Sequence, residues 1–163
     1  MLSVQECLPW VQTLAPPLQL ALIVLGWVWI AKDNDKRERR KEVRALIVEL
    51  KTHLIELEEN ARKYFTNEPD ATASLLASQI KRDLRRVDSN LEVLRRASGG
   101  IIAHAEMIEV RQAITLRGDF DGAARKAIQP THELLGDIGA SINKLCAKLE
   151  DEFTLKYGPR PKK

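Results

Sequence analysis

The pattern of apolar residues changes near residue 31. From Cys7 to Ala31 the chain has no charged residue, and Leu, Ile and Val crowd the segment from Leu14 to Ala31 without a polar side. At roughly −0.3 to −0.6 kcal/mol for each inserted Leu, Ile or Val, they outweigh the penalties from one glutamine and two prolines. The pattern predicts a transmembrane helix in residues 1–31, with a kink at the prolines or local thinning of the bilayer. The residues predicted to anchor it in the membrane are Trp10, Leu18, Leu20, Leu22, Ile23, Val24, Leu25, Trp27, Val28, Trp29 and Ile30.

Basic residues crowd one flank of this segment, and the other flank has no Lys or Arg. Since basic residues stay on the cytoplasmic side, we expect a single-pass protein of the inner (plasma) membrane. Its N-terminus would face outward, and its C-terminal domain would be cytoplasmic. The residues predicted to contact anionic lipid headgroups are Lys32, Lys36, Arg37, Arg39, Arg40, Lys41 and Arg44.

Farther along, apolar residues recur at alternating spacings of four and three, from Val43 to Tyr64. This is the heptad pattern of a helix with one apolar seam. Neither Gly nor Pro occurs from Ala31 to Glu68, so the membrane helix is expected to continue into this stretch. The candidate interface residues, which would pair in a homo-oligomer or dock a partner's helix, are Val43, Ile47, Leu50, Leu54 and Leu57.

The remaining chain repeats the helical period between breaks of Gly, Pro and turn residues. Helices are expected at 69–98, 101–116, 119–128 and 130–157. Asn67 or Glu68 would precede the helix at 69–98, and Asp119 would be the N-cap of the short helix that ends at 128. The predicted fold class is all-α: one N-terminal transmembrane helix followed by an antiparallel, coiled-coil-like bundle of three to four helices. The expected divisions are an anchor at 1–31, a basic juxtamembrane stretch at 32–44, a cytoplasmic bundle at 45–158 and a disordered basic tail at 159–163.

Composition agrees with helices, because aromatic residues are 5% of the chain and charged residues 30%. The net charge of +3 is too small to indicate nucleic-acid binding. Cys7 and Cys146 lie near opposite ends of the chain and on opposite sides of the predicted membrane, so no disulfide is expected. Cys146 falls in an apolar stripe and is expected to pack in the core.

No motif indicates catalysis. His132 and Glu133 begin a zinc-protease pattern, but Gly136 stands where the second histidine belongs. His53 and His104 are isolated, and neither a phosphate-binding loop nor a nucleophile motif occurs. The sequence therefore predicts a non-enzymatic protein with no cofactor, metal or small-molecule substrate.

The favoured interpretation is a membrane-anchored interaction or scaffold protein that binds lipids and either a protein partner or a second copy of itself. In a general way the arrangement resembles small anchored helical proteins of bacteria or phages. One alternative is a phage lysis or envelope-spanning component with its helical part in the periplasm, which requires the opposite orientation. Another is a membrane-bound nucleic-acid binder, which is disfavoured because acidic residues interleave with its basic ones. The basic residues in question are Lys81, Arg82, Arg85, Arg86, Arg95 and Arg96.

Overall fold

The computed structural model describes the backbone of residues 4–116, 120 and 125–159, and side chains within those ranges except at 4–19, 21 and 71. Several predictions lie outside the described residues: the side chains of Trp10 and Leu18, the cap at Asp119, and tail residues 160–163. The described chain divides into two compact units, Met1–Arg40 and Lys41–Lys163. Each unit is described by itself below.

The described residues form four helices and no strand, which confirms the predicted all-α class. The helices are α1 (Val4–Thr66), α2 (Ala71–Ser98), α3 (His104–Thr115) and α4 (Glu133–Tyr157). Helix α1 contributes to both units and is unbroken through the stretch that lacks Gly and Pro. Among the described residues, no helix combines the length and the apolar character that crossing a membrane requires.

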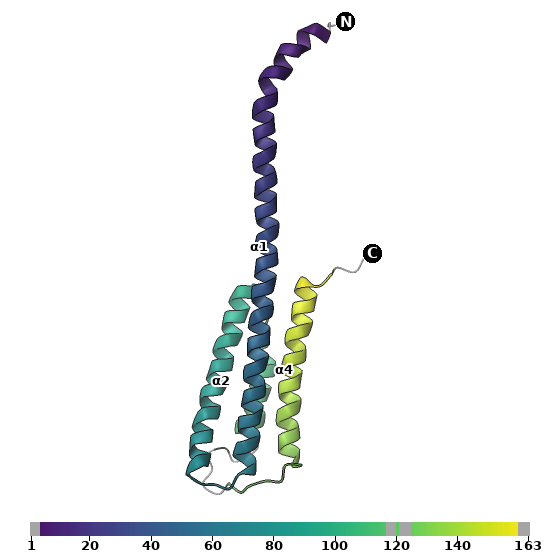
Figure 1. The fold of residues 1–163 in the computed structure, drawn as a ribbon. Coiled ribbons are helices and arrows are strands. Elements are labelled where there is room, and N and C mark those ends of the chain that lie inside the picture. The colour runs from purple at the N-terminus through teal and green to yellow at the C-terminus, as the bar shows by residue number, and fades with distance from the viewer. Residues whose placement is uncertain (1–3, 117–119, 121–124, 160–163) are drawn as a thin grey trace. The chain divides into compact units, whose positions relative to one another are not determined.

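The second unit is a helical bundle with one apolar core (Figure 1). Side chains of α1, α2, α3 and α4 meet there because each helix carries apolar residues on one face. The α1 seam contributes Val43, Ile47, Leu50, Leu54 and Leu57, each with no exposed surface. Opposite them lie residues such as Ile80, Val110 and Leu145, which are equally buried.

Polar side chains bridge neighbouring helices around this core and show their order. The bridges join Asn60 to Asp83 between α1 and α2, Arg111 to Asp88 between α2 and α3, Lys144 to Glu109 between α3 and α4, and Arg44 and Lys51 to Glu150 between α4 and α1. The four helices therefore form a closed ring in which each contacts the next. Short connections between α1, α2 and α3 make these neighbours antiparallel.

The ends of α2 show where local chemistry sets helix boundaries. The helix begins two residues later than the predicted Pro69, because the side chain of Asp70 accepts a hydrogen bond from the Ala73 amide at 2.9 Å. Its predicted end is confirmed. Gly99 adopts the left-handed conformation with φ of 68°, and its N–H donates to the carbonyls of Arg95 and Arg96.

The prediction of a short helix at 119–128 is wrong for residues 125–128, because residues 125–129 are not helical. Their polar groups instead contact the C-terminus of α1. The Ile128 amide donates to the Phe65 carbonyl at 3.0 Å, and Arg125 donates to the Tyr64 carbonyl. These bonds pair carbonyls that the end of a helix would leave without a partner.

Helix α4 begins at Glu133, three residues after the predicted start. The Nδ1 atom of His132 accepts a hydrogen bond from the Leu134 amide at 3.1 Å, so the imidazole caps the helix. This contact gives His132 a structural role as a helix cap. The zinc-protease motif that His132 begins is incomplete in the sequence. Among the residues that the structure describes, no cluster of His, Cys, Asp and Glu can hold a metal ion.

Candidate functional site

The first unit carries a stretch of α1 whose apolar side chains are exposed in every direction. Nine large apolar residues between positions 20 and 30 retain between 49% and 79% of their accessible surface, and the two tryptophans are the most exposed of them. They are Leu20, Leu22, Ile23, Val24, Leu25, Trp27, Val28, Trp29 and Ile30. Because successive helical residues turn by about 100°, these positions surround the helix completely. A continuous apolar surface of this kind marks an interaction site.

The predicted headgroup residues of the first unit are all exposed. Arg37 pairs with Asp33 one turn earlier, at 3.1 Å. Within the described chain, Lys32, Lys36 and Arg40 make neither an ion pair nor a side-chain hydrogen bond. Three positive charges therefore follow the apolar stretch directly and are available to an anionic surface.

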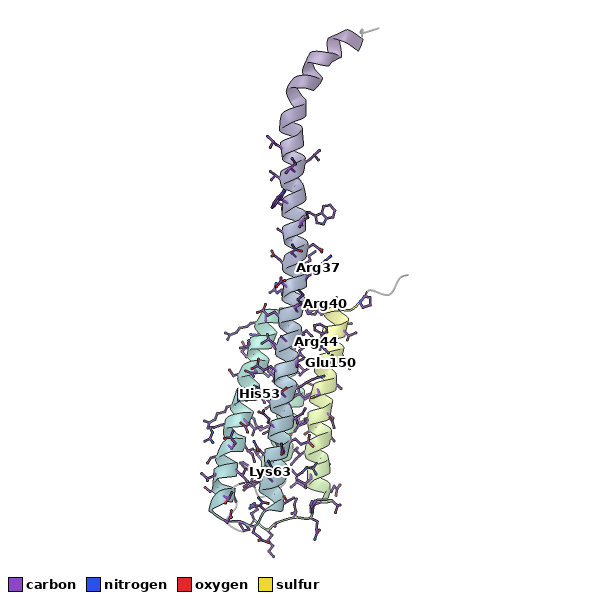
Figure 2. All side chains as sticks on the ribbon, viewed as in Figure 1. Arg37, Arg40, Arg44, His53, Lys63 and Glu150 are labelled. Atoms are coloured by element: carbon purple, nitrogen blue, oxygen red, sulfur yellow. The ribbon has the colours of Figure 1, made fainter. Side chains whose placement is uncertain are left out.

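Arg44 was predicted to contact headgroups, but in the second unit it binds across the α1–α4 interface. Its guanidinium donates to one oxygen of Glu150 at 2.5 Å and lies 5.3 Å from the centre of the Phe153 ring, while Lys51 donates to the other carboxylate oxygen. Figure 2 shows Arg44 of α1 and Glu150 of α4 facing each other. Hydrogen bonds from Lys51 and Arg44 lower the pKa of Glu150. This cluster joins two helices of the bundle.

The predicted interface residues lie inside the bundle. Val43, Ile47, Leu50, Leu54 and Leu57 have no exposed surface, so a partner helix cannot reach them while the bundle is folded. The prediction assigned this seam to another chain, because a heptad pattern looks the same whichever helices cover it. In the structure, α2, α3 and α4 of the same chain supply the covering residues.

The basic residues at the end of α2 are already paired. Arg95 and Arg96 both donate to Glu92, at 2.7 and 2.8 Å. Hydrogen bonds from these two guanidinium groups lower the pKa of Glu92 to about 2. One carboxylate therefore offsets half of their positive charge within one turn of the helix.

The middle of α2 leaves a smaller basic surface. Arg82 donates to Gln79 at 2.6 Å, and Lys81 lies 5.7 Å from the centre of the Phe120 ring. Arg85 and Arg86 are exposed and form no ion pair in the described part of the chain. Two free arginines are a small footprint beside the six to ten phosphate contacts of a typical nucleic-acid interface.

Arg125 is a buried charge that no sequence motif identifies. It is 5% exposed, its guanidinium carbon lies 4.3 Å from the centre of the Tyr64 ring, and it donates to the Tyr64 carbonyl. A positive charge at the C-terminus of α1 also complements the helix dipole. No local pattern indicates this role, because its partner lies 61 positions away along the chain.

A groove of about 300 Å³ lies between α3 and α4. Lys144 of α4 and Glu109 of α3 form an ion pair at 2.7 Å on its lining. The remaining lining is mostly small or uncharged and includes Ala113, Ala140 and Ser141. Its lysine and glutamate are paired with each other, and Asp137, its other charged residue, also has an interaction partner, so the groove has no set of free charges converging on a ligand.

Cys146 is half-buried on α4, as the sequence predicts for a core-facing residue. Burial raises the pKa of its thiol, so the sulfur stays protonated at neutral pH. A protonated thiol is a poor nucleophile, and no activating partner is paired with it among the described residues.

Comparison with protein-family models, with curated proteins and with solved structures finds no match to this chain.

Proposed function

We propose that this protein is a membrane-tethered helical module, in which the apolar stretch of α1 enters a lipid bilayer and the bundle formed by residues 41–159 stays in water. The observation that supports the proposal is the exposure of nine large apolar side chains on all sides of one helical segment. Catalysis has no part in it.

The free energy of these exposed side chains favours an apolar environment. Fully burying one Leu, Val or Ile contributes about 1.5–3 kcal/mol, so the seven Leu, Val and Ile residues among the nine, each about half exposed or more, forgo on the order of 10 kcal/mol in water. A helix with no packing partner is also only marginally stable in water. Hydrocarbon would satisfy both requirements, since it covers every side of the helix and leaves its backbone hydrogen bonds intact.

The described apolar segment is too short to cross a bilayer without the residues that precede it. As a helix, Leu20 to Ala31 measures about 18 Å, whereas the hydrocarbon core of a bilayer is about 30 Å thick. The uncharged run begins at Cys7 in the sequence, so the proposed insertion includes residues whose side chains lie outside the described part. Local thinning of the bilayer would reduce the length that is needed.

The free basic residues support one orientation. Lys32, Lys36 and Arg40 follow the apolar stretch, and no Lys or Arg precedes it in the sequence. Because basic flanks are retained on the cytoplasmic side, we propose that the bundle is cytoplasmic. Attraction between these charges and anionic headgroups would contribute about 1 kcal/mol per residue.

Alkaline carbonate extraction of membranes from cells that express the full chain tests the tether. We expect the wild-type protein to stay in the membrane pellet, and the triple variant Leu22→Asp, Val24→Asp, Leu25→Asp to be released. The matched control replaces three exposed apolar residues of the bundle, Leu75, Ile108 and Leu155, with Asp, and it should stay in the pellet. Release of the wild-type protein by carbonate would refute the tether.

A reporter that is active only in the cytoplasm, fused after Lys163, tests the orientation. Activity supports the cytoplasmic bundle. An inactive but membrane-bound fusion would favour the periplasmic alternative, in which the same module spans part of the envelope. A second reporter that is active only in the periplasm, fused at the same position, should give the opposite result.

A further inference from the structure

The outward face of α1 in the second unit carries a short apolar stripe that no part of the described chain covers. Its members are Ala45, Val48, Thr52 and Ile55, all exposed, with Val48 at 53% and Ile55 at 62%. The hydroxyl of Thr52 donates to the Val48 carbonyl at 3.1 Å, so this side chain makes its polar contact within its own helix. We call these four residues the outer stripe.

The outer stripe has the spacing of a second heptad seam. Its positions are separated by three, four and three residues, which is the repeat of helices that pack as a coiled coil. At about 100° per residue, the stripe lies opposite the buried seam that contains Ile47 and Leu50. Helix α1 therefore has one seam for its own bundle and another that faces away from it.

The charges beside the outer stripe favour a second copy of the same chain. Arg44, Lys51 and Glu58 form the row on one side of the stripe, and Glu49, Glu56 and Lys63 form the row on the other side. In a parallel two-stranded coiled coil, the first row of each helix faces the second row of its partner, and these pairs select the partner and its direction. Arg44 then meets Glu49, Lys51 meets Glu56, and Glu58 meets Lys63, so all three contacts join opposite charges.

The opposite direction is disfavoured. In an antiparallel pair centred on the outer stripe, each row faces its own copy, so Arg44 meets Glu58, but Lys51 meets Lys51 and Glu49 meets Glu49 of the second copy. Such contacts between like charges are unfavourable. From the stripe and these two rows, we propose that the protein forms a parallel homodimer through the outer stripe of α1.

The contacts within one chain leave room for the first two of these pairs, whereas Glu58 and Lys63 are already paired with Arg62 and Glu59. Arg44 and Lys51 already hold Glu150, but a guanidinium has five N–H donors and an ammonium has three, so each can bind a second carboxylate. Glu49 and Glu56 lie 3.5 and 3.4 Å from the ring of His53, and both side chains are more than half exposed. The stripe covers about three helical turns, so the dimer is expected to be weak and crosslinking suits it better than chromatography.

Disulfide crosslinking of the full chain in detergent solution tests the dimer. In a variant without Cys7 and Cys146, Ile55→Cys places a thiol on the stripe, where a parallel pair brings identical positions within the 4.4–6.8 Å Cα separation of a disulfide. We expect several times more covalent dimer than from the control Leu75→Cys, a position on α2 that is slightly more exposed than Ile55. Equal yields from the two variants would overturn the proposal.

Charge reversal tests the register. Adding Glu49→Lys and Glu56→Lys to the Ile55→Cys variant opposes like charges, and the dimer yield should fall to that of Leu75→Cys. The control Glu68→Lys with Glu133→Lys makes the same change in net charge away from the stripe and should keep the dimer. If Glu49→Lys with Glu56→Lys leaves the yield unchanged, the proposed pairing is wrong.

Folding of each variant is checked by far-ultraviolet circular dichroism. Should Glu49→Lys with Glu56→Lys disturb the bundle, Val48→Asp replaces it as a single change at an exposed stripe position, with the same expected loss and the same overturning result. Because crosslinking is performed in detergent, its result does not depend on membrane insertion. Carbonate extraction reports on insertion separately.

Discussion

Two stretches of α1 use similar residues in opposite ways. Between Leu20 and Ile30, large apolar side chains point in all directions and stay exposed. Between Val43 and Tyr64, apolar side chains recur every three or four positions and are buried against the other helices of the bundle. Both stretches are helical, so their difference lies in the surroundings that each apolar surface requires.

The comparison shows that the spacing of apolar residues and the share of the helix surface that they cover carry different information. A stripe covers about a third of the helix surface and can be satisfied by neighbouring helices, with charged residues left in water on the other side. An apolar surface that goes all the way round has no side to leave in water. It therefore needs an environment that surrounds the helix, such as hydrocarbon.

The largest difference between the two stretches is expected when the same charged residue is placed in each of them. Leu54→Asp puts an unpaired carboxylate in the bundle core, where Leu54 has no exposed surface, and should destabilise the bundle by more than about 4 kcal/mol. Leu25→Asp should leave the unfolding of the bundle unchanged, because Leu25 is 65% exposed. Urea unfolding followed by circular dichroism measures both. A similar loss of stability in the two variants would contradict the comparison.

The second prediction concerns the charges that follow the exposed stretch. Reversing Lys32, Lys36 and Arg40 to Glu removes about 1 kcal/mol of headgroup attraction per residue, roughly 3 kcal/mol in all, and should invert or mix the orientation. The cytoplasmic reporter after Lys163 measures the change. As a matched control, Arg82, Arg85 and Arg86 on α2 are reversed in the same way. If the control alters the orientation as strongly, the position of the basic residues beside the apolar stretch does not determine the orientation.

A smaller effect should come from the cluster that joins α1 to α4. Glu150→Gln removes the charge that Arg44 and Lys51 hold, and it should cost about 1 kcal/mol, since the groups are partly exposed. The lowered pKa of Glu150 means that this contribution is complete above the ordinary value of 4.5 and is lost as pH falls through the folded-state pKa.

Unfolding measured at pH 7 and again well below pH 4.5 should show the wild-type protein and Glu150→Gln converging in stability on acidification. Membrane retention of the wild-type chain should not change over the same interval, because residues 7–31 contain no ionisable acid or base other than Cys7. A difference between the two proteins that stays constant down to the lowest pH would contradict the assigned role of Glu150.

The smallest effect is expected at Glu92. Its carboxyl should titrate near pH 2, because Arg95 and Arg96 both donate to it. Carbon NMR of the carboxyl group measures this pKa directly, and Arg95→Ala with Arg96→Ala should return it toward 4.5. Bundle stability should change little, since the three side chains lie on the surface. A titration of wild-type Glu92 near 4.5 would show that these pairs do not form in solution.

Much of the bundle could be predicted from local patterns. The seam of α1 predicts its buried face, and the glycines after Ser98 predict the end of α2. The starts of α2 and α4 were misplaced by two or three residues, because a proline marks where a helix can begin. Asp70 and His132 decide where it does, through the amides that they cap.

The candidate sites divide in the same way. The exposed apolar stretch and the free basic residues after it could be identified from the sequence, because both depend on residue type along one segment. The roles of Arg44 and Arg125 could not, because their partners lie 106 and 61 positions away. The outer stripe was also missed, since its residues stand out only once the buried face of α1 is known.

By itself, the sequence determined that the chain is helical, where α1 carries apolar residues on every side and where it carries a single seam, because hydrophobic periodicity is a property of neighbouring residues. Only the tertiary structure decided that α2, α3 and α4 cover the seam, that Arg44 turns to Glu150, and that the outer stripe stays open. The physical reason is that burial and charge pairing depend on which segments meet in space, and separation along the chain does not specify those meetings.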